Sequence, residues 1–215
     1  MRPGLFGLVQ QANDDITAFP QMSAATRRHQ ADKKMHQRCE GYRPGYCESD
    51  TWLSLLQQWQ NYSGQELLVN LNAAINTYTY RADKSNYARE DYWATPRELI
   101  ENGGDCEDFA IAKMLALQHL GVPAKVMRIV VVQNTVTARP HAVLAVSHGE
   151  NTVILDNKTD AVFTDAELPH YVPLYSINER QWWLHMPFEV AERLFVQTAS
   201  TNGSAEQMNG GIVSR

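Results

Sequence analysis

Residues 103–110 read Gly-Gly-Asp-Cys-Glu-Asp-Phe-Ala, which places Cys106 in the expected first turn of a helix, directly after a glycine pair. The apolar spacing that follows predicts a central helix over about 105–119, ending before Gly121. A helix N-terminus offers unpaired backbone N–H groups and a partial positive charge, which favour a thiolate and also suit an oxyanion. The stretch therefore predicts a helix that presents a nucleophilic cysteine.

Three carboxylates surround this cysteine, at Asp105, Glu107 and Asp108. Nearby negative charge raises the pKa of a thiol, so these acids oppose its activation. Either a cation neutralises them or Cys106 is inert. A hard cation would reverse the local field, and Ca²⁺ prefers carboxylate and carbonyl oxygens. The alternative, acids that only complement the helix dipole, accounts better for one or two of them than for three.

Composition indicates an ordinary globular protein. The 215 residues are 44% hydrophobic and 20% charged, with a net charge of -5 and a pI near 5.8. This acidic balance argues against nucleic acid as the main partner. No apolar run approaches the ~20 residues of a membrane span, and residues 5–9 are too short for a signal-peptide core. We expect a soluble protein with no membrane insertion.

The chain is expected to form one main domain. Residues 1–48 form an N-terminal arm packed on the body, with a polar helix over about 23–38; residues 49–197 form the domain, and residues 198–215 a disordered tail. In the arm, basic side chains from Arg27 to Arg38 indicate the solvated face of a helix, or a docking patch for an acidic partner. Cys39 and Cys47 bracket a turn, so either a short-loop disulfide or three reduced thiols fit the cysteine pattern.

Helices precede strands along the domain. Apolar residues recur at helical spacing over 52–59, and capping boxes begin helices after Ser63 and Thr95. After Gly121 the period changes to two, which predicts strands at 124–133, 140–147 and 152–156, the last two as a hairpin. Further strands are expected at 172–177 and 181–184, and a final helix at 188–197. This order predicts an α+β fold, with a helical part packed on an antiparallel sheet.

The hairpin supplies a candidate base and its orienting acid. If Ser147 pairs with Thr152, His141 lies diagonally beside Asp156 on the same face of the sheet. A two-residue loop of His148 and Gly149 would instead set them directly opposite, and a three-residue loop would put them on different faces. Cysteine on a helix, histidine on a strand and aspartate on the next is the order of papain-like and transglutaminase-like folds. A strand histidine and a turn aspartate without a catalytic role remain the alternative.

Several blocks of sequence together resemble the bacterial transglutaminase-like cysteine proteinases. They are dense from about residue 50 to 184, and they occur in the family's order and at similar spacing. The blocks are Asp91-Tyr92-Trp93-Ala94-Thr95-Pro96-Arg97-Glu98, residues 103–113 around Cys106, Pro140-His141-Ala142-Val143-Leu144-Ala145, Ile154-Leu155-Asp156-Asn157 and Tyr175-Ser176-Ile177-Asn178.

The resemblance implies a papain-like/transglutaminase-like fold and a cysteine endopeptidase. Cys106 then corresponds to the nucleophile, His141 to the general base and Asp156 to its orienting acid, while Asp105, Glu107 and Asp108 match acidic positions implicated in Ca²⁺ binding. Trp93 matches a family tryptophan near the cleft, or is simply a buried aromatic. The family also implies a periplasmic location, an alanine-rich cleavage site in the retention segment of a large surface adhesin, and a membrane cyclic di-GMP receptor that sequesters the protease.

Two other functions remain open at this point. The same three residues serve transglutamination, in which an amine replaces water in the second step. A noncatalytic calcium-dependent binding module is the alternative from another class, and it predicts that Cys106→Ala leaves function intact.

Overall fold

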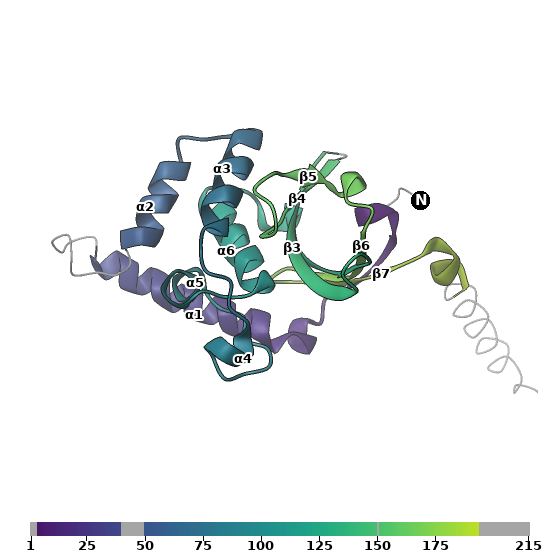
Figure 1. Cartoon of the computed structure of the whole chain (residues 1–215), viewed down its shortest axis with the longest axis horizontal. Coiled ribbons are helices and arrows are strands. Elements are labelled where there is room, and N and C mark those ends of the chain that lie inside the picture. The colour runs from purple at the N-terminus through teal and green to yellow at the C-terminus, as the bar shows by residue number, and fades with distance from the viewer. Residues whose placement is uncertain (1–3, 40–49, 150, 194–215) are drawn as a thin grey trace, which may run out of the picture.

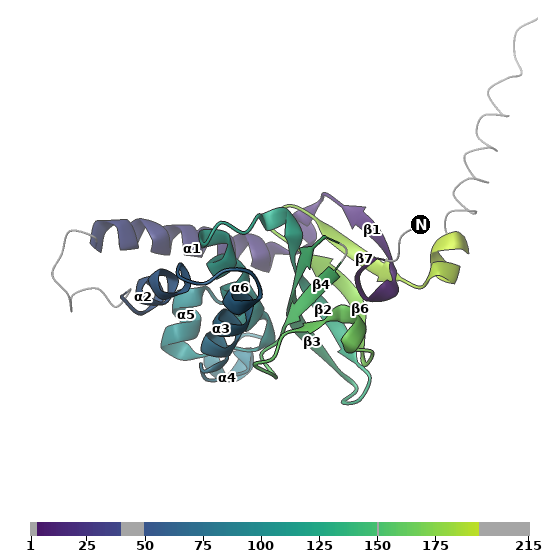
Figure 2. The same cartoon turned by 90° about the horizontal axis from the view of Figure 1, so that it is seen from above.

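A helical layer packs against one side of a strongly curved antiparallel sheet in the computed structural model, which describes residues 4–39, 50–149 and 151–193 (Figure 1). The view from above shows the helices gathered at one end of the molecule and the strands at the other (Figure 2). The α+β prediction is confirmed. The α-helices are α1 (Pro20–Cys39), α2 (Asp50–Trp59), α3 (Gly64–Asn76), α4 (Asp83–Asn86), α5 (Pro96–Asn102) and α6 (Cys106–His119).

Helix α6 lies at the centre, between the other helices and the sheet. It contacts α3 and α5 on one side and two strands on the other. Every residue from Asp108 to Leu117 is buried. A helix that is buried all round requires apolar residues on every face, and this explains why the segment is a nearly continuous apolar run. The predicted central helix is confirmed within one residue at its start.

Seven strands form one sheet in the order β1-β7-β6-β2-β3-β4-β5, with every neighbouring pair antiparallel. Their inner face packs on α6 through residues such as Ile129, Leu144 and Ile177. The strands are β1 (Val9–Asn13), β2 (Met127–Asn134), β3 (Arg139–His148), β4 (Asn151–Leu155), β5 (Phe163–Thr164), β6 (Tyr171–Ile177) and β7 (Trp182–Met186).

The β3–β4 hairpin has the register that the sequence predicts. Ser147 pairs with Thr152, and Leu144 pairs with Leu155. His148 also pairs with Asn151, so the strands extend one pair further than expected and only two residues connect them. This register puts the residue after β4, Asp156, diagonally beside His141 of β3.

Two local predictions turn out differently, and a third lies partly outside the described residues. The N-terminal segment contains β1, which pairs with β7 at the edge of the sheet, although its sequence lacks a strong strand pattern. The capping box at Thr95 is formed, but the Ser63 side chain makes no capping bond. Gly64 adopts a left-handed φ of +54°, so the first turn of α3 lacks the regular geometry that this bond needs. The final helix is described only over residues 188–193.

The basic face of α1 is not fully solvated, so that interpretation is wrong at two positions. Arg28 forms an ion pair with Glu98 and donates a hydrogen bond to the carbonyl of Trp93. His29 is 3% exposed. The side chains of Cys39 and Cys47 and the tail from residue 198 lie outside the described residues. Among those that are described, no helix is long and apolar enough to cross a membrane.

Candidate active site

Two glycines determine where α6 begins. Gly103 ends α5 with a left-handed φ of +78°, and its N–H donates to the carbonyl of Leu99. Gly104 is bonded through both of its backbone groups, since its N–H donates to Thr79 O at 3.1 Å and its carbonyl accepts from Arg81 N at 2.8 Å. A side chain at Gly103 would meet the carbonyl of Thr79. The glycine pair thus allows the close backbone approach that fixes the first turn of the helix.

His141 and Asp156 form a buried hydrogen-bonded pair. His141 Nε2 lies 2.7 Å from Asp156 Oδ1, and each residue is 3% exposed. Because the carboxylate binds Nε2, the other ring nitrogen, Nδ1, is left to exchange a proton with a second group. This is the contact between His141 and Asp156 that the hairpin register predicts.

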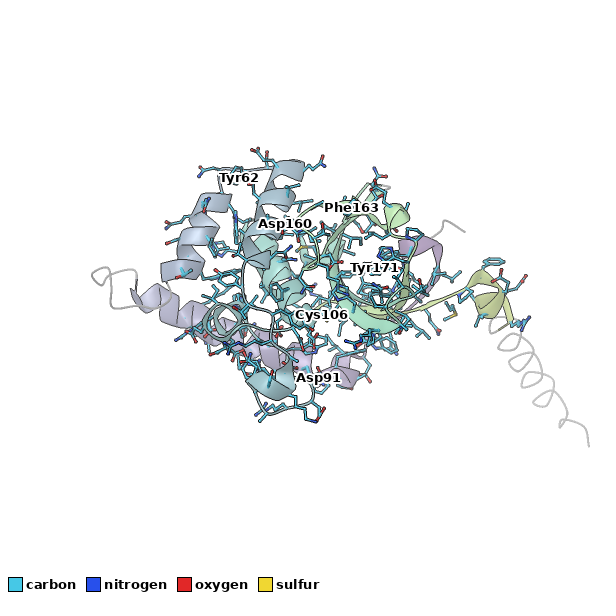
Figure 3. The ribbon with its side chains drawn as sticks, viewed as in Figure 1. Tyr62, Asp91, Cys106, Asp160, Phe163 and Tyr171 are labelled. Atoms are coloured by element: carbon cyan, nitrogen blue, oxygen red, sulfur yellow. The ribbon has the colours of Figure 1, made fainter. Side chains whose placement is uncertain are left out.

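A cavity of about 510 Å³ brings the cysteine and the histidine together. Cys106 and His141 both line it, at the boundary between helices and sheet where Figure 3 shows Cys106. The remaining lining residues are Tyr80, Thr137, Arg139, Pro140, Asn157 and Lys158. The cavity is open to solvent, and Cys106 is one of the residues that line it.

The surroundings of Cys106 strongly oppose ionisation of its thiol. Burial raises its pKa, and the negative charge of Glu107 raises it further. The sulfur lies 3.3 Å from Glu107 Oε2, to which the thiol donates. A hydrogen bond from the Ala142 backbone acts in the opposite direction. The charge argument made from the sequence therefore holds in the fold, since the carboxylates oppose formation of the thiolate.

The carboxylates beside the cysteine belong to a larger cluster. Asp83, Asp91 and Glu107 have oxygens within 4.8 Å of one another, and so do Asp83, Asp105 and Asp108. One oxygen each of Asp83 and Asp105 is buried without a hydrogen-bond partner among the described residues. Burial raises the pKa of Asp83 to about 6, and that of Asp105 and of Asp108 to about 8. Unpaired buried carboxylate oxygens at this spacing fit a hard divalent cation.

Hydrogen bonds that involve Asp108 and Trp93 hold the acidic cluster in place. Asp108 is fully buried and accepts hydrogen bonds from the N–H groups of Ala94, at 2.6 Å, and Asp105, at 3.0 Å. The indole of Trp93 donates to Asp91 Oδ1 at 2.9 Å and is 5% exposed. Trp93 does not line the cavity of Cys106; it orients an acid of the cluster.

Asp156 is held by more groups than the sequence suggested. Its Oδ1 also accepts the N–H of Lys158 at 2.9 Å, and its Oδ2 accepts the hydroxyl of Tyr171 at 2.6 Å. Burial acts to raise the pKa of Asp156, but hydrogen bonds from His141, Tyr171 and Lys158 hold it at about 2. The carboxylate is therefore ionised and fixed at both oxygens.

Sequence reasoning missed three members of the site. Asp91 opens one of the blocks that carry the family resemblance, so its position was a usable signal. Asp83 lies in a short helix without any motif, and Tyr171 begins a strand of ordinary pattern. Both reach the site only through tertiary packing, which local sequence does not encode.

Comparison with known proteins defines the class. The profile of the bacterial transglutaminase-like cysteine proteinases (BTLCP) matches residues 33–189. The chain belongs to this family, and the protein is a cysteine peptidase. The family resemblance, the fold and the enzyme class predicted from the sequence are confirmed.

The chain is similar to solved structures of one particular protease, LapG of Legionella pneumophila. Calcium-bound LapG superposes with a TM-score of 0.61 at 29% identity, over 71% of this chain and 86% of that one. EGTA-treated LapG gives 0.60 at 27% identity, over 74% and 90%. No curated protein matches the sequence.

Proposed function

We propose that the protein is a calcium-dependent cysteine endopeptidase with Cys106 as nucleophile, His141 as general base and Asp156 as orienting acid. The observation that carries the proposal is the buried hydrogen bond between His141 and Asp156, in a wall of the cavity that Cys106 also lines. The cysteine is the first residue of a fully packed helix, and the backbone N–H groups in the first turn of a helix have no partner within the helix. Nucleophile, base and orienter are the three groups that covalent acyl transfer needs.

In the first half of the reaction, the thiol proton of Cys106 moves to Nδ1 of His141, and the sulfur attacks the peptide carbonyl. Backbone N–H groups at the start of α6 stabilise the oxyanion that forms. The imidazolium then gives its proton to the leaving amine as the C–N bond breaks. Asp156 stays ionised throughout and stabilises the positive charge on the ring.

In the second half, water attacks the thioester. His141 takes a proton from this water, and the C–S bond breaks to release a carboxylic acid and the Cys106 thiol. If the carbonyl attacked in the first half is the side-chain amide of a glutamine, ammonia is the leaving amine, and a lysine amine in place of water gives an isopeptide product. The products of the reaction therefore distinguish hydrolysis from transglutamination.

Asp105, Glu107 and Asp108 are the acids that we assign to a calcium site, together with Asp83 and Asp91. The buried unpaired oxygens of Asp83 and Asp105 support this assignment, and LapG, the similar protease, has been solved both bound to calcium and treated with EGTA. A Ca²⁺ ion held by these acids would supply positive charge near Cys106, and this charge would lower the pKa of its thiol.

For the substrate, we propose the N-terminal retention segment of a large surface adhesin, cut at an alanine-rich site, in the periplasm. A membrane receptor for cyclic di-GMP is the proposed regulatory partner. These assignments rest on the family resemblance. They place the enzyme in the control of biofilm attachment.

The test is iodoacetamide labelling of Cys106, mapped by mass spectrometry, with Ca²⁺ and with EGTA. We expect fast labelling near neutral pH with Ca²⁺, and a loss of at least about tenfold in EGTA or in His141→Ala. The control is His119→Ala, which removes an exposed histidine at the far end of α6 and should label like the wild type. Labelling no faster than a free thiol in every condition would remove the chemical basis of the proposal.

Product analysis completes this test. The active protein is incubated with a proteome-derived peptide library, and the products are read by mass spectrometry. New peptide termini indicate hydrolysis, whereas isopeptide masses would indicate transglutamination. Cys106→Ala should give neither, and a function that survived this substitution would point to a binding module instead.

A further inference from the structure

Tyr171 contacts two members of the proposed triad at once. Its hydroxyl donates to Asp156 Oδ2 at 2.6 Å, and both residues are buried. Its ring lies against the ring of His141, with centroids 5.8 Å apart and planes tilted by 50°. Figure 3 shows Tyr171 on the sheet side of the site, across from Cys106. One side chain thus packs against the base and bonds the acid that orients it.

The backbone holds this tyrosine firmly. Tyr171 is the first residue of β6, where it pairs with Asn134 of β2, and its N–H donates to the carbonyl of Leu168 at 3.0 Å. The ring is 5% exposed and belongs to an apolar cluster beneath the sheet that includes Val132 and Val143. Its hydroxyl therefore has a fixed position from which to donate.

The two oxygens of Asp156 have different partners. Oδ1 accepts from His141 and from the N–H of Lys158, whereas Oδ2 has the Tyr171 hydroxyl as its donor. A carboxylate that is bonded at one oxygen can still rotate about its Cβ–Cγ bond. Bonds to both oxygens fix its plane, and with it the plane of the imidazole. Loss of the Tyr171 hydroxyl would also leave a buried charged oxygen without a partner.

We propose that Tyr171 is a positioning residue of the enzyme, which fixes the Asp156 carboxylate through its hydroxyl and the His141 ring through its own ring. The proposal rests on the proposed triad of Cys106, His141 and Asp156. In this arrangement the proton-accepting atom of His141 is kept in place by two side chains, one from the β3–β4 hairpin and one from β6.

The test compares Tyr171→Phe with the wild type in the rate of Cys106 alkylation by iodoacetamide, with Ca²⁺ present. The variant keeps the ring and removes only the hydroxyl. A hydrogen bond to a charged group contributes about 1.5–3 kcal/mol, so we expect the rate to fall by roughly tenfold or more. The matched control is Tyr62→Phe, at the far side of the helical layer in Figure 3, which should react like the wild type.

A double-mutant cycle separates positioning from general stability. In an Asp156→Ala background the hydroxyl has no carboxylate to orient, so Tyr171→Phe should cause no further loss of rate. An equal loss in both backgrounds, or no loss in either, would overturn the proposal. If Asp156→Ala and His141→Ala react at the wild-type rate, the proposed triad is wrong. If these two variants are inactive but Tyr171→Phe reacts at the wild-type rate, only the role of Tyr171 is wrong.

A second measurement does not depend on reactivity. Carbon-13 NMR of the Asp156 carboxyl, in the Cys106→Ala protein, reports the pKa of that group directly. Because the Tyr171 hydroxyl bonds the ionised form, Tyr171→Phe should raise this pKa above its wild-type value of about 2. If Tyr171→Phe does not fold, 3,5-difluorotyrosine at this position keeps both ring and donor, and it should retain the alkylation rate; a tenfold loss there would overturn the proposal.

Discussion

Replacement of Gly104 by alanine should disable the site from outside the triad. Gly104 is buried, and a Cβ at this position would lie 2.7 Å from the Cβ and 2.9 Å from the Cγ of Asp108. Real Cβ atoms essentially never approach other heavy atoms below 3.0 Å, so the Asp108 side chain must move. It cannot move freely, because its oxygens accept the backbone N–H groups of Ala94 and Asp105.

The loss of folding stability in Gly104→Ala can be estimated from these contacts. Overpacking costs about 1–3 kcal/mol, and loss of one hydrogen bond to the buried carboxylate about 1.5–3 kcal/mol. The sum, roughly 2.5–6 kcal/mol, is a large part of the 5–15 kcal/mol that stabilises a typical domain. For a chain of this size it corresponds to a fall of roughly 5–24 °C in the melting temperature.

Differential scanning calorimetry with Ca²⁺ measures this fall, and iodoacetamide labelling measures the effect on Cys106. Labelling of the folded variant should slow, because Asp108 bonds the residue directly before the nucleophile. Gly121→Ala is the control, since Gly121 has a φ of +90° with nothing within 4 Å of an added Cβ and so tests backbone strain alone, about 1–2 kcal/mol. A Gly104→Ala protein that melts and labels like the wild type would refute the reasoning.

Three further predictions concern charge. Asp156→Asn should slow Cys106 alkylation at least about 100-fold. The folded pKa of Asp156, about 2, is below its unfolded value, so the ionised carboxylate stabilises the folded protein fully above pH ~4, and this stabilisation is lost as the pH falls toward 2. Calorimetry should find no such loss in the Asp156→Asn variant. In EGTA, the melting temperature should fall as the pH rises from 5 to 8. The folded pKa of Asp108, about 8, lies above its unfolded value, so in this range the folded state binds a proton that the unfolded state has lost. Added Ca²⁺ should reverse the fall. Burial lowers the pKa of Lys113 to about 7, so below pH 7 the buried lysine is charged and the free-energy cost of burying that charge is at its largest. Lys113→Met should therefore raise the melting temperature more at pH 6 than at pH 9.

The sequence was most informative where local pattern and short-range geometry coincide. The glycine pair, the acids and the apolar run after Cys106 predicted the start and the burial of α6. A loop of even length between two strands was enough to place His141 and Asp156 on one face. Each of these inferences depends on residues that are close along the chain.

The parts that could not be predicted depend on distant contacts. The pairing of β1 with β7 joins segments more than 160 residues apart, and β1 has too little apolar alternation to be recognised alone. Asp83 reaches the acidic cluster because the turn at Gly103 and Gly104 binds residues 79–81. Tyr171 reaches Asp156 because β6 lies beside β2. No periodicity in the sequence encodes these juxtapositions.

The site lies across the junction between two layers of the molecule. Cys106 comes from the helical layer, while His141 and Asp156 come from the sheet, and the connection between them runs through Gly121 and Pro123. A chain cut at this connection would leave the sulfur on one fragment and the proposed proton acceptor, His141, on the other, and we expect each fragment to be inactive by itself. We expect activity to return when the two fragments associate. This architecture is therefore suited to a split enzyme, in which activity reports the association of two fragments.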